Sequence, residues 1–253
     1  MKKVLTFQLT AGGATVIGTA GSNSVNIGDD NTARAGATWP VPKKYAITKI
    51  SIMGALVTAI RLIRSTRQSD TIDLVPLADT QADLFQSFSL EEQGLPGIEL
   101  GQNGSLGIQM ALSGAGTGLV YLELDDSYSS ANYRGVLVAG SAPAVALGVP
   151  IESGGNLTAG LVPTDKYTPV YAHLASTTID AWWLGVQKKG WVLLEGSPVA
   201  VCPGAPPHWL TTRQSQVLSS TGQELIQGSS VMVSCFAADA AAVQLINVLW
   251  KVN

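Results

Sequence analysis

Charged residues are scarce in this sequence. Lys, Arg, Asp and Glu make up 13% of the 253 residues, whereas hydrophobic residues make up 46%. Soluble globular proteins usually contain roughly 25% charged residues. Low charge combined with many small side chains favours broad contacts between subunits, because few charges would have to be desolvated there. A stable, weakly charged secreted sandwich is the other interpretation of the same composition.

Clusters of basic residues and of cysteines are also missing. The net charge is −3, and neither terminus carries a run of Lys or Arg that would neutralise phosphates, so direct nucleic-acid binding is not expected. The two cysteines, Cys202 and Cys235, are too few for a disulfide framework and lack the spacing of metal ligands. We expect both to be small buried apolar residues.

Long apolar segments are absent as well. One uncharged, largely apolar run lies between Arg134 and Glu152, but it contains Pro143 and Pro150 and is shorter than the roughly 20 residues of a membrane-spanning helix. It predicts a linker and an entering strand. The opening MKKVLTFQLTAGGATVIG has too short an apolar stretch for a signal peptide, so we expect an ordered first strand there.

Motifs for catalysis are not found. The only histidines are His173 and His208, and the sequence contains no H-E-x-x-H, G-x-S-x-G or G-x-x-x-x-G-K-[ST] motif. We expect His173 to be a strand residue and His208 to pack or cap before a helix. The sequence therefore predicts no catalytic, cofactor-binding or metal site and no enzymatic activity. A glycoside hydrolase would need two carboxylates across one groove, and no such pair can be placed.

A few residue groups allow a functional alternative beside a structural one. Trp182 and Trp183 are adjacent in a predicted strand and so point to opposite faces. One is expected in the core and the other against a neighbour, although a sugar-stacking platform with Trp191 is the alternative. The acid pairs Asp29–Asp30 and Asp125–Asp126 are expected in solvated turns, with Ca²⁺ binding as the alternative. The glycines Gly114, Gly116 and Gly118 are expected in a turn, with a phosphate loop as the alternative. Asn103 and Asn156 lie in N-x-[ST] sequences, the acceptor pattern of N-glycosylation.

The two halves of the sequence repeat one another. At a shift of 125 positions, GIELGQ beginning at Gly97 matches GQELIQ beginning at Gly222 in four of six positions. The register continues downstream, where Leu106, Ile108 and Met110 fall on Val231, Val233 and Cys235. Near the start of each half, VPKKY (41–45) is similar to VPTDKY (162–167) at a shift of 121 or 122. A repeat that keeps its order over this length indicates two copies of one folding unit.

Short strands dominate the predicted elements. Apolar residues alternate with polar or small ones around Ile50, Ile72, Ile108, Val120 and Ile246. This alternation is the period of a strand with one buried face. Many short strands without long helices favour tandem antiparallel sandwiches over a doubly wound sheet.

The other predicted elements are short helices and turns. One short helix per half is predicted, at 78–88 and at 206–218. SGAGTG (113–118) and ADAAA (238–242) are predicted to join the last two strands of each half. Each half is therefore expected to close with a hairpin.

Two such sandwiches, each with a short helix before a G-x-E-L-x-Q strand entry and a closing hairpin, resemble the double jelly-roll major capsid proteins of icosahedral viruses. The resemblance is to the small members found in tailless bacteriophages with an internal membrane, and it covers nearly the whole chain. It implies an all-β fold of two tandem antiparallel jelly-roll sandwiches, each with one short helix. The first jelly-roll is expected at 1–133 and the second at 134–253.

The same resemblance implies a function. The chain is expected to be a structural capsid subunit that trimerises into pseudo-hexagonal capsomers and tiles an icosahedral shell in the virion. Its partners would be other copies of itself, with minor vertex proteins and an underlying lipid membrane as further candidates, and no direct contact with nucleic acid. The alternative is a carbohydrate-binding or adhesive tandem β-sandwich of the receptor-binding or tail-fibre type.

Overall fold

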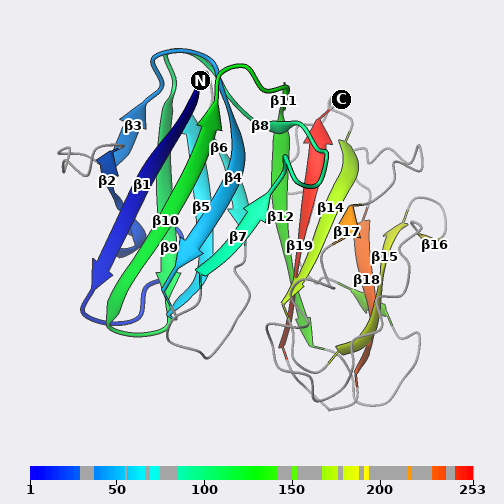
Figure 1. Ribbon diagram of the computed structural model, residues 1–253. Helices are drawn as coiled ribbons and strands as arrows, with labels where there is room; N and C mark the ends of the chain where they lie inside the picture. Colours follow the sequence, from blue (N-terminus) through cyan, green and yellow to red (C-terminus); the bar gives the residue numbers. More distant parts are fainter. Residues whose placement is uncertain are drawn as a thin grey trace. The chain divides into compact units, whose positions relative to one another are not determined.

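A computed structural model describes residues 1–28, 37–54, 56–65, 69–74, 85–141, 150–152, 167–175, 179–187, 191–193, 216–217, 230–237 and 243–252. The chain divides into two compact units, Met1–Tyr133 and Arg134–Asn253. Strands make up both units (Figure 1). Within the described ranges the only helix is a single 3-10 turn, η1 (Ala20–Ser22), and no helix there is long and apolar enough to cross a membrane.

The first unit is a sandwich of two sheets. One sheet has the strand order β11-β8-β4-β10-β1-β2, with β7 beside β4, and the other has the order β6-β5-β9-β3. The strands of the first sheet are β1 (Lys2–Ala11), β2 (Val25–Gly28), β4 (Tyr45–Met53), β7 (Phe85–Ser89), β8 (Gly97–Leu100), β10 (Gly116–Asp125) and β11 (Ser130–Ala131). Those of the second are β3 (Thr38–Pro40), β5 (Val57–Ser65), β6 (Ser69–Leu74) and β9 (Ser105–Leu112). The chain passes repeatedly between the sheets, as from β3 to β4, β4 to β5, β8 to β9 and β9 to β10, in the manner of a jelly-roll.

The second unit repeats this order. One set of four strands runs β17-β14-β19-β12 and the other runs β13-β18-β15-β16. The strands are β12 (Tyr133–Ser141), β13 (Pro150–Glu152), β14 (Tyr167–Ala175), β15 (Ile179–Gln187), β16 (Trp191–Leu193), β17 (Gln216–Val217), β18 (Ser230–Ala237) and β19 (Val243–Val252). Because both sets follow the strand order of the first unit, each unit is an antiparallel jelly-roll sandwich, as the sequence predicted.

Irregularities in the strands are duplicated too. In the first unit Thr48 is an extra residue where β4 pairs with β10, and Thr58 is an extra residue where β5 pairs with β9. In the second unit the extra residues are Val170 in β14 and Asp180 in β15, each 122 positions further on. A β-bulge bends its strand and increases the local twist. Two bulges at matching positions therefore show that the repeat extends to the shape of the strands.

The predicted buried faces of β9 and β10 are confirmed, whereas β4 buries residues on both faces, with Ser51 4% exposed as well as Ile50 and Ile52 buried. Val120, Leu122 and Leu124 are 0% exposed on β10, while Tyr121 and Glu123 between them are partly exposed. The same period of two buries alternate apolar residues of β1, β5 and β9, among them Leu5, Phe7, Leu9, Ile60, Leu62, Leu106, Ile108 and Met110. Full burial of one such side chain stabilises the fold by about 1.5–3 kcal/mol, so these faces form the core between the two sheets.

Neither predicted helix is found where the structure describes its residues. Residues 85–88 of the segment 78–88 lie in β7, and residues 216–217 of the segment 206–218 form β17; the remainder of both segments lies outside the described residues. The physical reason is visible at β4, which is nine residues long but pairs with β8 only at Tyr45–Ile47. The rest of this edge offers backbone N–H and C=O groups that need partners, and β7 pairs with it from Lys49 to Met53.

The predicted closing hairpins are wrong. Ser113–Ala115 connects β9, which pairs with β3 and β5, to β10, which pairs with β1 and β4 in the other sheet. The corresponding strands β18 and β19 likewise belong to different sheets. Small residues and glycines favour a tight turn in either case, so the composition of the turn does not distinguish a hairpin from a passage between sheets.

Candidate interaction surface

Among the residues that the structure describes, no group of three or more His, Cys, Asp or Glu side chains could hold a metal ion. His173 lies in β14 opposite Asn247, as expected for a strand residue. Trp182 and Trp183 lie in β15, where their strand partners are Cys235 and Ser234. The remaining candidates His208, Cys202, Asn156, Asp29 and Asp30 lie outside the described residues.

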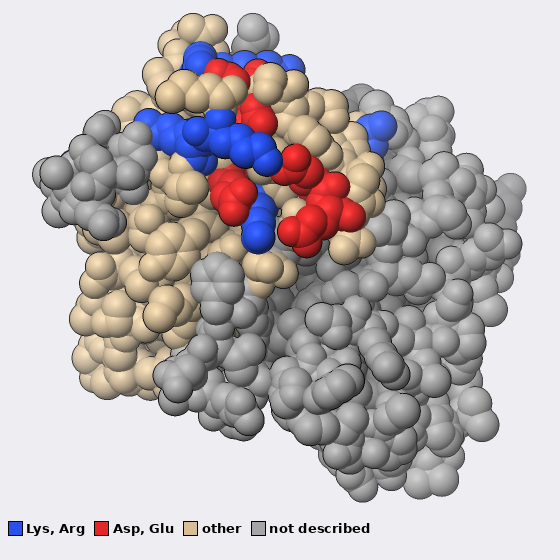
Figure 2. Space-filling view, in the orientation of Figure 1, with Lys and Arg blue, Asp and Glu red and all other residues tan. Residues whose placement is uncertain are grey.

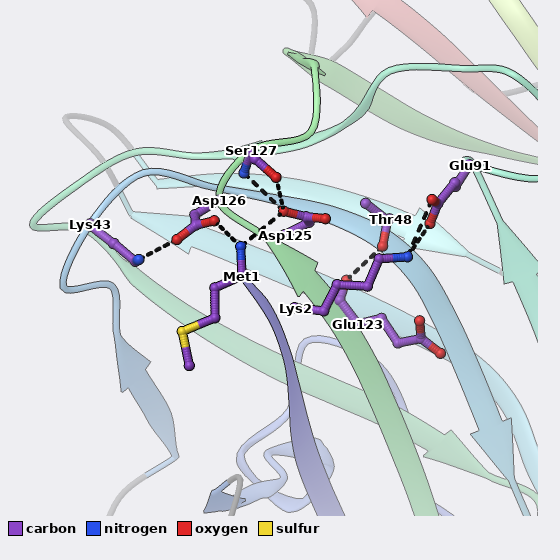
Figure 3. Close-up of polar contacts among 9 residues, drawn as sticks. All are labelled: Met1, Lys2, Lys43, Thr48, Glu91, Glu123, Asp125, Asp126 and Ser127. Carbon is purple, nitrogen blue, oxygen red and sulfur yellow. Dashed lines mark hydrogen bonds and ion pairs between the residues drawn. The ribbon is translucent and has the colours of Figure 1, made fainter.

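Asp125 and Asp126 are held by neighbouring donors and cations. Asp125 accepts hydrogen bonds from the backbone N–H of Ser127 at 2.9 Å and from its hydroxyl at 2.7 Å, and these bonds lower the pKa of its carboxyl. Asp126 pairs with Lys43 and with the amino group of Met1 (Figure 3). The Lys43 ammonium, followed by this amino group, lowers the pKa of Asp126 to about 2.

Two other predicted loop groups have structural roles. Asn103 lies between β8 and β9 with φ of 62°, a left-handed conformation that Asn adopts more readily than most residues. Its N–H donates to the carbonyl of Val41 at 2.9 Å. Gly116 and Gly118 lie within β10, where a Cβ on Gly118 would be 2.6 Å from the side chain of Val57. The glycines therefore serve close packing and a turn.

Many charged residues of the first unit gather near one end. In Figure 2 most of the blue and red side chains on this unit lie together, while much of its remaining described surface in this view is tan. Eight charged residues lie on or beside the outer face of the first sheet, and we call them the charged ladder. They are Glu91, Glu92 and Glu99 at β7–β8, Lys44 and Lys49 at β4, Glu123 and Asp125 on β10, and Lys2 on β1.

Strand register explains why the charged ladder shares one face. Glu99 pairs with Ala46, Ala46 with Asp125, and Asp125 with Lys2, so this row crosses β8, β4, β10 and β1. The next row joins Lys49 to Glu123. Residues opposite one another in neighbouring strands project to the same side of a sheet. The first row has uncharged Ala46 at β4, and Lys49 supplies the basic residue of this strand in the next row. Over both rows the charged side chains are acidic at β7–β8, basic at β4, acidic on β10 and basic on β1.

Ion pairs connect these strands across the face. Lys2 Nζ lies 2.9 Å from a carboxylate oxygen of Glu91 (Figure 3), and this pairing raises the pKa of Lys2. Lys44 Nζ lies 3.1 Å from Glu99. Lys49 Nζ lies 3.7 Å from Glu92 and 4.0 Å from Glu123. Exposed pairs of this kind contribute only about 0–1 kcal/mol each, so the charged ladder is a minor source of stability for the isolated subunit.

Two lysines stack on aromatic rings at the same end. Lys3 Nζ lies 5.5 Å from the ring centre of Trp39, and Lys43 Nζ lies 5.3 Å from that of Tyr45. The two rings are 5.8 Å apart and tilted by 57°. Trp39 and Tyr45 are almost fully buried. The cations therefore cover the aromatic end of the core, which is a favourable cation–π arrangement.

A buried arginine near this end was missed by the sequence analysis. Arg64 is 3% exposed and donates to the carbonyls of Glu99 at 2.9 Å and Tyr133 at 2.8 Å and to the side chain of Asn132 at 3.0 Å. Tyr133 is itself buried, which raises its pKa to about 12, and its hydroxyl donates to the carbonyl of Pro96. Alternation offered a signal, because Arg64 follows Ile60 and Leu62 at inward positions. Arg64 ties β5 to the last residues of the first unit.

Comparisons with known proteins give structural likenesses only. No family model and no curated protein matches the sequence. Among solved structures, the STIV MCP has a TM-score of 0.49 at 10% identity, covering 100% of this chain and 96% of that chain. The major capsid protein P2 from bacteriophage PM2 has a TM-score of 0.46 at 9% identity, with coverage of 100% and 98%. The structure of Sulfolobus Turreted Icosahedral Virus gives 0.45 at 9% identity, with coverage of 100% and 90%. Because these TM-scores lie below 0.5, the fold assignment depends on the strand order and bulges described above.

Proposed function

We propose that this chain is the structural major capsid protein of a virion, in which three copies form a pseudo-hexagonal capsomer and capsomers tile an icosahedral shell. The observation that carries the proposal is the duplication of a whole jelly-roll within one chain. Both units have the same strand order, and their bulges Thr48 and Thr58 match Val170 and Asp180.

Duplication within a chain has a geometric consequence for assembly. Three chains related by a threefold axis would place six similar sandwiches around that axis. Such a ring has nearly hexagonal symmetry and can pack against six neighbours, although it contains only three chains. A single sandwich per chain would need six copies for the same outline. The paired units thus supply a reason for two similar folds in one sequence.

The composition supports the same proposal. With 13% charged residues, most of the side walls of a sandwich can be covered by neighbours at a low cost of desolvation. Function would then lie in the surfaces, without an enzymatic site. The proposed partners are other copies of the chain first, with minor vertex proteins and an underlying lipid membrane as further partners of the shell.

Sedimentation of the purified chain in an analytical ultracentrifuge tests this function. The proposal predicts a species of three chains, each of 26.3 kDa, or larger particles built from it. A stable monomer that binds immobilised glycans would contradict it and favour the carbohydrate-binding alternative. Because tail-fibre proteins also trimerise, electron microscopy of the same sample completes the test by showing whether the trimers are compact rings or elongated fibres.

A further inference from the structure

We propose that the charged ladder pairs with the charged ladder of a second copy of this chain, face to face, about a twofold axis parallel to the strands. The proposal rests on the proposed function, because it names the surface by which neighbouring copies in the shell meet. The partner that binds the charged ladder is a second copy of the same chain, because the order of charges on this face is complementary to its own reverse.

The order of signs selects both the partner and the axis. From β7–β8 to β1 the strands carry acidic, basic, acidic and basic side chains. A twofold axis parallel to the strands reverses this order in the facing copy and keeps the charged ends together. Glu99 of one copy then faces Lys2 of the other in the first row. Lys49 faces Glu123 in the second row. A twofold axis in the same plane but perpendicular to the strands would place like signs opposite one another, which is unfavourable.

Most charges of the ladder are accessible to such a partner, whereas Asp125 is buried at 8% exposed. The side chains of Lys2 and Glu91 are 57% and 42% exposed, and that of Glu92 is 69% exposed. Pairs this exposed gain little in water because solvent screens them. Covering by a second copy would exclude water and allow each cation to contact a carboxylate of both chains, so that the interaction becomes stronger in the assembly than in the free subunit.

Apolar area is available on the same face. Val4 and Met53 are each 46% exposed, and both project outward, in line with Lys2 and Lys49 respectively, at steps of two residues along β1 and β4. A contact that combines exposed apolar side chains with a surrounding set of complementary charges has the usual anatomy of a protein interface. The charges would set its orientation, while burial of Val4 and Met53 would add affinity.

Exchanging the two members of one ion pair separates a contact between copies from a contact within the subunit. In the double variant Lys2→Glu with Glu91→Lys, the pair inside the subunit is kept with its signs reversed. Two copies of this variant remain complementary to each other at β1 and β7–β8. A variant copy facing a wild-type copy, however, meets like charges at both places. The matched control is Lys2→Arg with Glu91→Asp, which preserves the signs.

The test measures how often wild-type and variant chains enter the same assembly. Wild type labelled with ¹⁵N and unlabelled variant are purified separately, combined at low ionic strength and analysed by native mass spectrometry for assemblies larger than the trimer. We expect assemblies that contain both chains to fall roughly tenfold below random mixing for the exchanged variant, and to reach random mixing for the control. Added salt should reduce the discrimination, because screening shortens the range of these charges.

Several outcomes overturn the inference. Random mixing of the exchanged variant with wild type would show that the ladder acts only within the subunit. Wild-type trimers that form no larger species at low salt would show that this face does not pair. Both results leave the trimeric capsomer intact. A wild type that stays monomeric overturns the proposed function as well. If the exchanged variant fails to fold, as judged by circular dichroism, the variant Lys49→Glu with Glu123→Lys makes the same exchange at β4 and β10.

Discussion

The lowered pKa of the Asp126 carboxyl makes the stability of the fold depend on pH. Its folded pKa of about 2 lies below the roughly 3.9 of an unfolded Asp. Between these values the unfolded chain binds more protons, so stability rises with pH across this window. The contribution is fully present above about pH 4 and is lost as the pH falls through about 2.

Replacing Asp126 by Asn should therefore lower the melting temperature slightly at pH 5–7, where the ion pair with Lys43 is intact. The difference from wild type should shrink below about pH 4 and disappear near pH 2. Calorimetry over this pH range measures it, with Glu92→Gln as the control at a carboxylate that is 69% exposed. A difference between Asp126→Asn and wild type that stays constant down to pH 2 would show that the ion pair is not its cause.

Arg64 shows what sequence reasoning misses among single residues. A charged residue at an inward position of an alternating strand contradicts the simple pattern, and it donates hydrogen bonds to acceptors on Glu99, Asn132 and Tyr133. These acceptors lie far from β5 in sequence, so only the fold brings them together. The charged ladder was missed for the same reason: its members lie on five separate segments, and strand register together with the β7–β8 turn brings them to one face.

At the scale of elements, the turn between β8 and β9 depends on a glycine. A Cβ on Gly104 would lie 2.4 Å from the carbonyl oxygen of Ser65, a backbone atom that cannot move aside without displacing β5. Gly104→Ala should therefore destabilise the protein by about 1–3 kcal/mol, as measured by urea denaturation. Gly114→Ala is the matched control, because a Cβ there has nothing within 4 Å. Equal stabilities of the two variants would contradict this account.

The strands were more predictable than the connections between them. Alternation of apolar residues located β9 and β10, because a strand with one main buried face has a period of two, which is a local property. It also located β4, although that strand buries residues on both faces. The shift of 125 positions placed β18 on β9, residue for residue from Ser105–Leu112 to Ser230–Ala237. The hairpin and helix predictions failed because pairing partners are chosen by the whole sandwich. Ser113–Ala115 crosses between sheets, and residues 85–88 pair with the open edge of β4.

At the scale of the whole molecule, the chain contains two jelly-roll units with the same strand order. The repeat found in the sequence reaches the strand order and the bulges, although GQELIQ at 222–227 lies outside the described residues. Composition could not predict the position of the candidate surface. Low overall charge favours broad contacts but does not indicate which face of the sandwich makes them. The alternating signs of the ladder became visible only when the strands were placed side by side.

Electron cryomicroscopy of the purified assembly can show whether each chain contributes two similar sandwiches to one ring. The account predicts rings with threefold symmetry in which six jelly-roll sandwiches surround the axis, two from each chain. A ring with one sandwich per chain, or a particle in which the two units of a chain do not superpose, would contradict it.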